Sequence, residues 1–89
     1  MVGRQASHVN VRALFFATYR DLIGASEVEV ELAPGATVTD FLETLRTLGE
    51  PFQSLPARPS VAVNHRYAHP DDVLTEGDEV ALIPPVAGG

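Results

Sequence analysis

The chain has no cysteine and no lysine among its 89 residues. Without cysteine it cannot form a disulfide, hold zinc or an iron–sulfur cluster through thiolates, or attack a substrate with its own thiol. Any sulfur that this protein handles must therefore be carried by another group. Without lysine, all six basic side chains other than histidine are arginines.

Long apolar runs are also absent. No run approaches the ~20 residues that cross a bilayer, and the first residues, MVGRQASH, lack the apolar core of a secretion signal. We therefore expect a cytoplasmic protein that does not enter a membrane. The net charge is −6, and a negative field repels phosphate, so we expect no nucleic-acid partner and favour a basic protein surface.

The first third of the chain predicts two strands joined by a helical turn. Val9–Phe16 (VNVRALFF) is rich in β-branched and aromatic residues, which favours a strand. ATYRDLIG predicts a short helical turn that Gly24 ends. In Glu27–Ala33 (EVEVELA), glutamates alternate with apolar residues, as in a half-buried strand. Such a charged face usually prevents aggregation, and a docking surface for basic partners is the alternative.

The clearest helix begins after Thr37. Thr37 and Asp40 have the spacing of a capping box, and Gly49 with Pro51 predicts the stop. Residues at helical spacing form one apolar stripe, namely Val38, Phe41, Leu42, Leu45 and Leu48.

Two more strands, Ser60–Asn64 and Glu79–Pro85, are predicted, with an edge strand or turn between them. One helix stripe covers one sheet face, which gives a two-layer α+β domain over residues 9–85, after a flexible extension at residues 1–8. The order resembles the ubiquitin-like β-grasp: a mixed sheet of four to five strands, one main helix on one face, and the first and last strands adjacent at the centre. A ferredoxin-like split fold is the alternative, but it needs a second helix of proper length.

No pattern in the chain predicts a metal site or a catalytic pocket. His65 and His69 stand four apart, but Pro70 follows and the segment reads as strand and turn, so helical spacing does not apply. The serines have no neighbours that indicate a catalytic triad. We expect no bound cofactor.

The sequence closes on IPPVAGG, Ile83 to Gly89. Pro84 and Pro85 cannot donate ladder hydrogen bonds, so they direct the chain out of the sheet. We expect residues 86–89 to project as an extended arm of up to ~3.5 Å per residue. Because Gly88 and Gly89 have no Cβ, such an arm could enter a narrow channel of another protein that acts on the carboxylate. A frayed end of no consequence is the alternative.

Three stretches of the chain together resemble the small subunits of molybdopterin synthases, namely LFFATYRDLIG, VAVN and LTEGDEVALIPPVAGG. The resemblance covers residues 9–89. It implies a ubiquitin-like sulfur carrier. A ubiquitin-activating-like adenylyltransferase would use ATP to adenylate the Gly89 carboxylate, and a sulfurtransferase persulfide would convert it to a thiocarboxylate. Sulfur would then pass to a cyclic pterin phosphate in the large synthase subunit, during molybdenum cofactor biosynthesis. The chain would be non-catalytic alone and would act in a hetero-oligomer.

The resemblance also implies site residues. Gly88 and Gly89 match the reactive terminal pair. Phe16, Tyr67 and Ile83 fall at positions of apolar contact with partners, and Pro84, Pro85 and Val86, which lead into the arm, are further candidates for partner binding. Ile83 stands where an aromatic is common, and each of the three has an alternative place in the sheet core.

Two other functions stay open. One is a related β-grasp carrier for thiazole, cysteine or tRNA thiolation, or a ubiquitin-like modifier; a polymeric tag is disfavoured because the chain has no lysine. The other is a passive β-grasp interaction module whose Gly-Gly is incidental.

Overall fold

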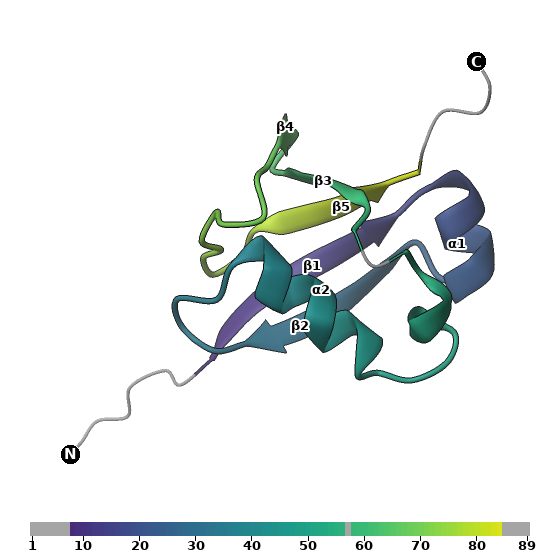
Figure 1. The fold of residues 1–89 in the computed structure, drawn as a ribbon, viewed down its shortest axis with the longest axis horizontal. Helices are drawn as coiled ribbons and strands as arrows, with labels where there is room; N and C mark the ends of the chain where they lie inside the picture. The colour runs from purple at the N-terminus through teal and green to yellow at the C-terminus, as the bar shows by residue number, and fades with distance from the viewer. Residues whose placement is uncertain (1–7, 57, 85–89) are drawn as a thin grey trace.

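The computed structural model describes residues 8–56 and 58–84. One five-stranded sheet is covered on one face by a helix, with a second, shorter helix at one end (Figure 1). The strands are β1 (Val9–Phe15), β2 (Glu27–Leu32), β3 (Ser60–Val63), β4 (Arg66–Tyr67) and β5 (Glu79–Ile83), and the helices are α1 (Ala17–Ile23), α2 (Val38–Arg46) and the 3-10 turn η1 (Phe52–Ser54). Residues 1–7 of the expected extension, Pro85, and the expected arm of residues 86–89 with Val86, Gly88 and Gly89 lie outside the described residues, whereas His8 is described and exposed.

The strand order is β2-β1-β5-β3-β4, so the first and last strands are neighbours at the centre. β1 and β5 run parallel, and the other pairs are antiparallel. This confirms the predicted mixed sheet of the ubiquitin-like β-grasp. Val80 and Leu82 of β5 are fully buried, as is Ala13 of β1, because the central strands lie beneath the helix.

The capping box of α2 is present as predicted. The backbone N–H of Asp40 donates to Thr37 Oγ1 at 3.3 Å, and the backbone N–H of Thr37 donates to Asp40 Oδ2 at 3.0 Å. These bonds satisfy donors that the first turn leaves free. Val38, Phe41 and Leu45 are buried against the sheet, so they supply the core contacts of the expected stripe.

The far end of the predicted helix is wrong. Helix α2 ends at Arg46, three residues before Gly49, and Thr47 is its C-cap. The backbone N–H groups of Thr47 and Leu48 each bond a carbonyl three residues back, as in a tightened last turn. Leu48 is consequently 46% exposed and not part of the buried stripe.

Further boundaries differ from the sequence prediction, and β2 and β3 each end one residue early, at Leu32 and Val63. The expected helical turn is a seven-residue α-helix, α1, and Gly24 ends it with φ of +84° as predicted. Strand β1 stops one residue before Phe16, because Phe16 is the N-cap of α1. Strand β5 ends at Ile83, and Pro84 already lies outside it. The edge strand β4 is two residues long and follows a turn at Asn64 and His65.

Candidate functional site

The face of the sheet opposite α2 carries the residues that the sequence singled out. In β1 and β5, side chains buried under the helix alternate with half-buried or exposed ones. The residues on this open face include Leu14 in β1, and Ala81 and Ile83 in β5. Phe16 has an extended backbone (φ −124°, ψ 156°), so it continues the alternation onto the same face.

Strand register brings these residues into one continuous surface. Leu14 lies beside Ala81, Ala81 beside Ala62 of β3, and Ala62 beside Tyr67 of β4. One apolar row therefore crosses four strands. We call Leu14, Phe16, Ala62, Tyr67, Ala81 and Ile83 the apolar strip.

Two aromatic side chains at the ends of the strip face solvent. Tyr67 is 78% exposed on the edge strand, and Phe16 is 49% exposed where β1 enters α1. Burial of this much aromatic surface is characteristic of protein interfaces. Exposure rules out the core alternative for Phe16 and Tyr67, whereas Ile83 is half-buried. Their roles as partner contacts stay predictions.

A charged band lies beside the strip on the same face. Arg12 reaches Glu27 of β2 at 3.6 Å (Nη1 to Oε1) and Glu79 of β5 at 3.3 Å (Nη2 to Oε2). His65 Nε2 lies 3.8 Å from Glu79 Oε1. Glu29 and Glu31 are exposed along β2, as the alternation predicted. The open face is thus apolar toward the end of β5 and charged toward its beginning.

The apolar strip lies where the chain leaves the sheet. Ile83, the last residue of β5, pairs with Ser60 at the start of β3. β5 runs parallel to β1, which leads directly into α1, so Phe16 and Ile83 lie at the same end of the sheet (Figure 1). Pro84 follows at this end. A partner that binds the strip would therefore lie next to Pro84, the last residue that the structure describes.

A buried phenol lies in α1, next to this end of the sheet. Tyr19 is 6% exposed, and its hydroxyl has no hydrogen-bond partner in the described part of the chain. Burial raises the pKa of Tyr19 above its ordinary value, because the charged phenolate would lose its hydration. Tyr19 is therefore a core residue without a role in acid–base chemistry near neutral pH.

The described residues offer no catalytic constellation. Within residues 8–56 and 58–84, no three His, Cys, Asp or Glu side chains converge as metal ligands. His65 and His69 are both exposed, as expected for surface loops. No helix in these ranges is long and apolar enough to cross a membrane. The arrangement is suited to docking another protein.

The chain also has clear relatives. Residues 13–89, most of its length, match the ThiS family. The chain belongs to the ThiS family. It is 35% identical over 83 residues to a molybdopterin synthase sulfur carrier subunit of Chlamydomonas reinhardtii, covering 91% of this chain and all of that one. The family assignment that LTEGDEVALIPPVAGG suggested is confirmed.

Solved structures agree with this assignment. One is a protein of Pyrococcus furiosus assigned as subunit 1 of a molybdopterin converting factor. It has a TM-score of 0.77 and 36% identity, and the match covers 88% of this chain and 99% of that one. Small archaeal modifier protein 1 of Haloferax volcanii has the same TM-score at 28% identity, with the same coverage. The β-grasp fold is thus shared with both carriers and modifiers.

Sequence reasoning missed part of the strip. Leu14, Ala62 and Ala81 were not predicted as site residues, although alternation along their strands contained the signal. What the sequence could not supply was the register that places them between Phe16 and Tyr67.

Proposed function

We propose that this protein is the sulfur carrier subunit of a molybdopterin synthase. The observation that carries the proposal is the coincidence of the apolar strip with the exit of the chain toward Gly88-Gly89. Relatives named as sulfur carrier subunits, matched over nine-tenths of the chain, support it. The part of the chain beyond Pro84 would be the reactive group, and the folded domain would present it.

Chemistry at Gly89 would begin with activation. A carboxylate is a poor electrophile, so a cytoplasmic adenylyltransferase partner would join it to the α-phosphate of ATP and release pyrophosphate. A persulfide of a sulfurtransferase would then attack the carbonyl carbon and displace AMP. A second thiol would take the donor's sulfur from the resulting acyl disulfide and leave the thiocarboxylate. This route needs no cysteine in the carrier, in agreement with its composition.

The strip would hold the carrier on the large synthase subunit during sulfur transfer. Docking over Phe16, Tyr67 and Ile83 would orient the departing arm toward the active site of that subunit, where a cyclic pterin phosphate accepts the sulfur. Gly88 and Gly89 would pass a channel too narrow for side chains, while Pro84, Pro85 and Val86 would span the distance. The sulfur would bond to a pterin carbon, water would hydrolyse the resulting thioester at the Gly89 carbonyl carbon, and the carrier would leave with a carboxylate, ready for another cycle.

Whole-protein mass spectrometry of the protein from its native cells tests the carrier chemistry. We expect a form in which sulfur replaces one oxygen, localised to the last peptide. If activating enzyme, ATP and sulfur donor together never produce this form, the sulfur-carrier function is excluded. The likeness to small archaeal modifier protein 1 favours a second candidate, protein conjugation, which the same spectra would reveal as an isopeptide between Gly89 and a lysine of another protein.

Charge placed on the strip tests the docking step. Tyr67→Arg should weaken binding to the large subunit at least tenfold, because an arginine would replace the most exposed aromatic contact of the strip. Tyr67 is 78% exposed, so the free energy of unfolding should change by no more than about 0.5 kcal/mol. Val73→Arg is the matched control, since Val73 is 58% exposed and lies outside the strip. Equal losses of affinity for the large subunit in the two variants would contradict docking through the strip.

A further inference from the structure

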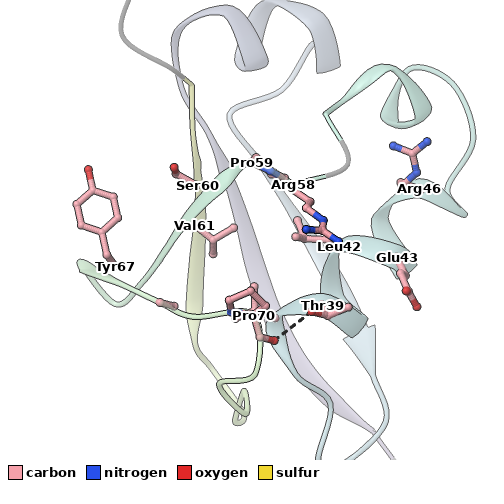
Figure 2. Close-up of a pocket in the computed structure, with 12 residues that line it drawn as sticks. Thr39, Leu42, Glu43, Arg46, Arg58, Pro59, Ser60, Val61, Tyr67 and Pro70 are labelled. Carbon is pink, nitrogen blue, oxygen red and sulfur yellow. Dashed lines mark hydrogen bonds between the residues drawn. The ribbon is translucent and has the colours of Figure 1, made fainter.

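A second surface lies around the sheet edge from the apolar strip. A groove of about 660 Å³ runs between α2 and the segment from β3 past β4 (Figure 2). Its walls are mainly apolar, with Leu42 on one side and Val61 on the other. Thr39 Oγ1 donates to the Pro70 carbonyl at 3.2 Å and ties the two walls together at one end. Volume and lining are those of a binding groove.

Two arginines lie at the opposite end of the groove. Arg46 comes from α2 and Arg58 from the segment before β3, and both line the groove (Figure 2). Arg46 donates through Nη1 to the Leu55 carbonyl at 3.0 Å. No carboxylate of the described residues lies within ion-pair distance of either guanidinium, and Glu43, which also lines the groove, pairs with neither. Arg12 differs, since it pairs with both Glu27 and Glu79.

The positive charge of this groove contrasts with the rest of the molecule. The whole chain has a net charge of −6, yet two arginines and only one glutamate, Glu43, line this mainly apolar groove, and Glu43 forms no ion pair with either arginine. Guanidinium groups bind carboxylates through paired hydrogen bonds. The groove is therefore complementary to a segment with apolar side chains and at least one carboxylate.

The groove is continuous with the apolar strip. Tyr67 belongs to the strip and also lines the groove. It lies in β4, the two-residue strand at the edge of the sheet, which pairs only with β3 among the described strands. A protein that covers Tyr67 on the open face can thus extend around this short edge into the groove.

We propose that the groove between α2 and the β3–β4 edge binds an apolar, carboxylate-bearing segment of the large subunit, with the carboxylate on Arg58 and on the free N–H groups of Arg46. The inference rests on the proposed function, because it takes the large subunit as the protein that covers the strip. The carrier would then be held from two sides, by its open face and by its helix side.

Arg58→Glu tests the charge pair. We use Arg58 because it is exposed and, unlike Arg46, has no hydrogen bond within the described structure. Titration of the full-length carrier into the purified large subunit should show binding weakened about tenfold or more, with melting unchanged. Arg66→Glu is the control, since it makes the same charge change at an exposed arginine that does not line the groove; it should weaken binding by less than threefold.

Photo-crosslinking locates the segment. A photoreactive amino acid at Thr39, inside the groove, should attach to a stretch of the large subunit that contains Asp or Glu among apolar residues. The same probe at Thr75, which does not line the groove, should not. The proposal is overturned if Thr39 yields no such product and Arg58→Glu binds like its parent. It is overturned equally if the two arginine variants lose the same affinity, or if Arg58→Glu changes only self-association of the carrier.

Tyr67→Arg separates the two proposals. If it abolishes binding while the groove variants do not, the groove assignment fails and the carrier function stands. If the large subunit binds neither the parent nor any variant, the proposed function itself fails.

Discussion

At the scale of single residues, Tyr19 is the most unusual member of the core. Its ring is buried in the hydrophobic core, but its hydroxyl has no hydrogen-bond partner among the described residues. A buried hydroxyl that has lost water without gaining a hydrogen bond destabilises the folded state. The ring supplies the packing, so the oxygen itself is dispensable.

Tyr19→Phe should therefore stabilise the protein, by about 1 kcal/mol at neutral pH. The substitution should also reduce the loss of stability at alkaline pH. Because burial raises the pKa of Tyr19, the unfolded chain loses this proton at lower pH than the folded protein, and stability of the parent falls as pH rises above about 10. Thermal melts at pH 7 and at alkaline pH should show a smaller decline in the variant. A lower melting temperature at pH 7 would indicate that the hydroxyl has a bound partner.

Local interactions could be predicted from the sequence, whereas the orientation of side chains in the sheet could not. The capping pair Thr37–Asp40 was predictable because its interaction is local, three residues apart. Exposure of Phe16 was not, because its neighbour Phe15 is also a phenylalanine and lies fully inside the core. Which of two adjacent aromatic residues faces the helix depends on strand parity, which is fixed only when β1 pairs with β2 and β5.

At the scale of elements, the β3–β4 hairpin contains a strained turn. Asn64 and His65 have φ of 50° and 74°, the values of a two-residue type I′ turn, in which the second position prefers glycine. Asn64 also links the turn to β5: its side-chain amide donates to Asp78 Oδ1 at 2.9 Å, and its Oδ1 accepts from the backbone N–H of Glu79 at 3.0 Å. Asn64 therefore stabilises the turn through its hydrogen bonds, whereas His65 contributes a strained left-handed backbone conformation.

His65→Gly should raise the free energy of unfolding, by up to about 1 kcal/mol, because it removes the Cβ clash of a left-handed residue. Asn64→Ala is the companion variant and should lower it by roughly 1–3 kcal/mol, since the backbone N–H of Glu79 loses its acceptor. Chemical denaturation measures both. If His65→Gly were destabilising, the contact of His65 with Glu79 would outweigh the strain.

Changes at the C-terminal Gly88-Gly89 should affect function without affecting stability. Appending two residues after Gly89 should leave the free energy of unfolding within about 0.5 kcal/mol of the parent, as for an exposed site. Sulfur transfer should vanish, because misplacing the reacting carbon by ~1 Å can already cost about a hundredfold. Gly88→Ala should be milder but still harmful, through its added Cβ.

Leu45→Ala is the opposite control for that experiment. Leu45 is 1% exposed in α2, so truncation should cost roughly 2–5 kcal/mol and reduce activity only through unfolding. A thermal melt beside a coupled assay with activating enzyme and large subunit distinguishes variants that lose stability from variants that lose only sulfur transfer. An extended carrier that works as well as its parent would make a passive interaction module the better interpretation.

At the scale of the whole molecule, the absence of lysine has a chemical consequence. An acyl adenylate or acyl disulfide is an electrophile that amines could capture, whereas arginine is a poor nucleophile at neutral pH. We expect Arg58→Lys with Arg66→Lys to form self-linked products during activation, visible as cross-linked bands that need ATP and the activating enzyme. No increase over the parent would show that the composition has no protective effect.

The fold as a whole was predictable to the extent that it follows from local pattern. Alternation in Glu27–Leu32, the cap at Thr37 and the turn at Gly24 gave the correct elements in the correct order. The sequence placed the end of α2 too late, because Leu48 continues the apolar spacing although the last turn has tightened before it. The groove with Arg46 and Arg58 could not be foreseen, since its walls come from segments that only tertiary packing brings together.

The parallel pairing of β1 with β5 also determines when the molecule can fold. The centre of the sheet is completed by the strand that the ribosome makes last, and that strand contributes Val80 and Leu82 to the core. A nascent chain that has emerged only as far as β4 lacks this strand, so β1 would have one open edge and the core one missing wall. Folding must then follow the synthesis of β5, and a prematurely terminated chain would be a substrate for proteases. Few molecules could therefore form the complete apolar strip while lacking β5, the strand that contributes Ala81 and Ile83 to it.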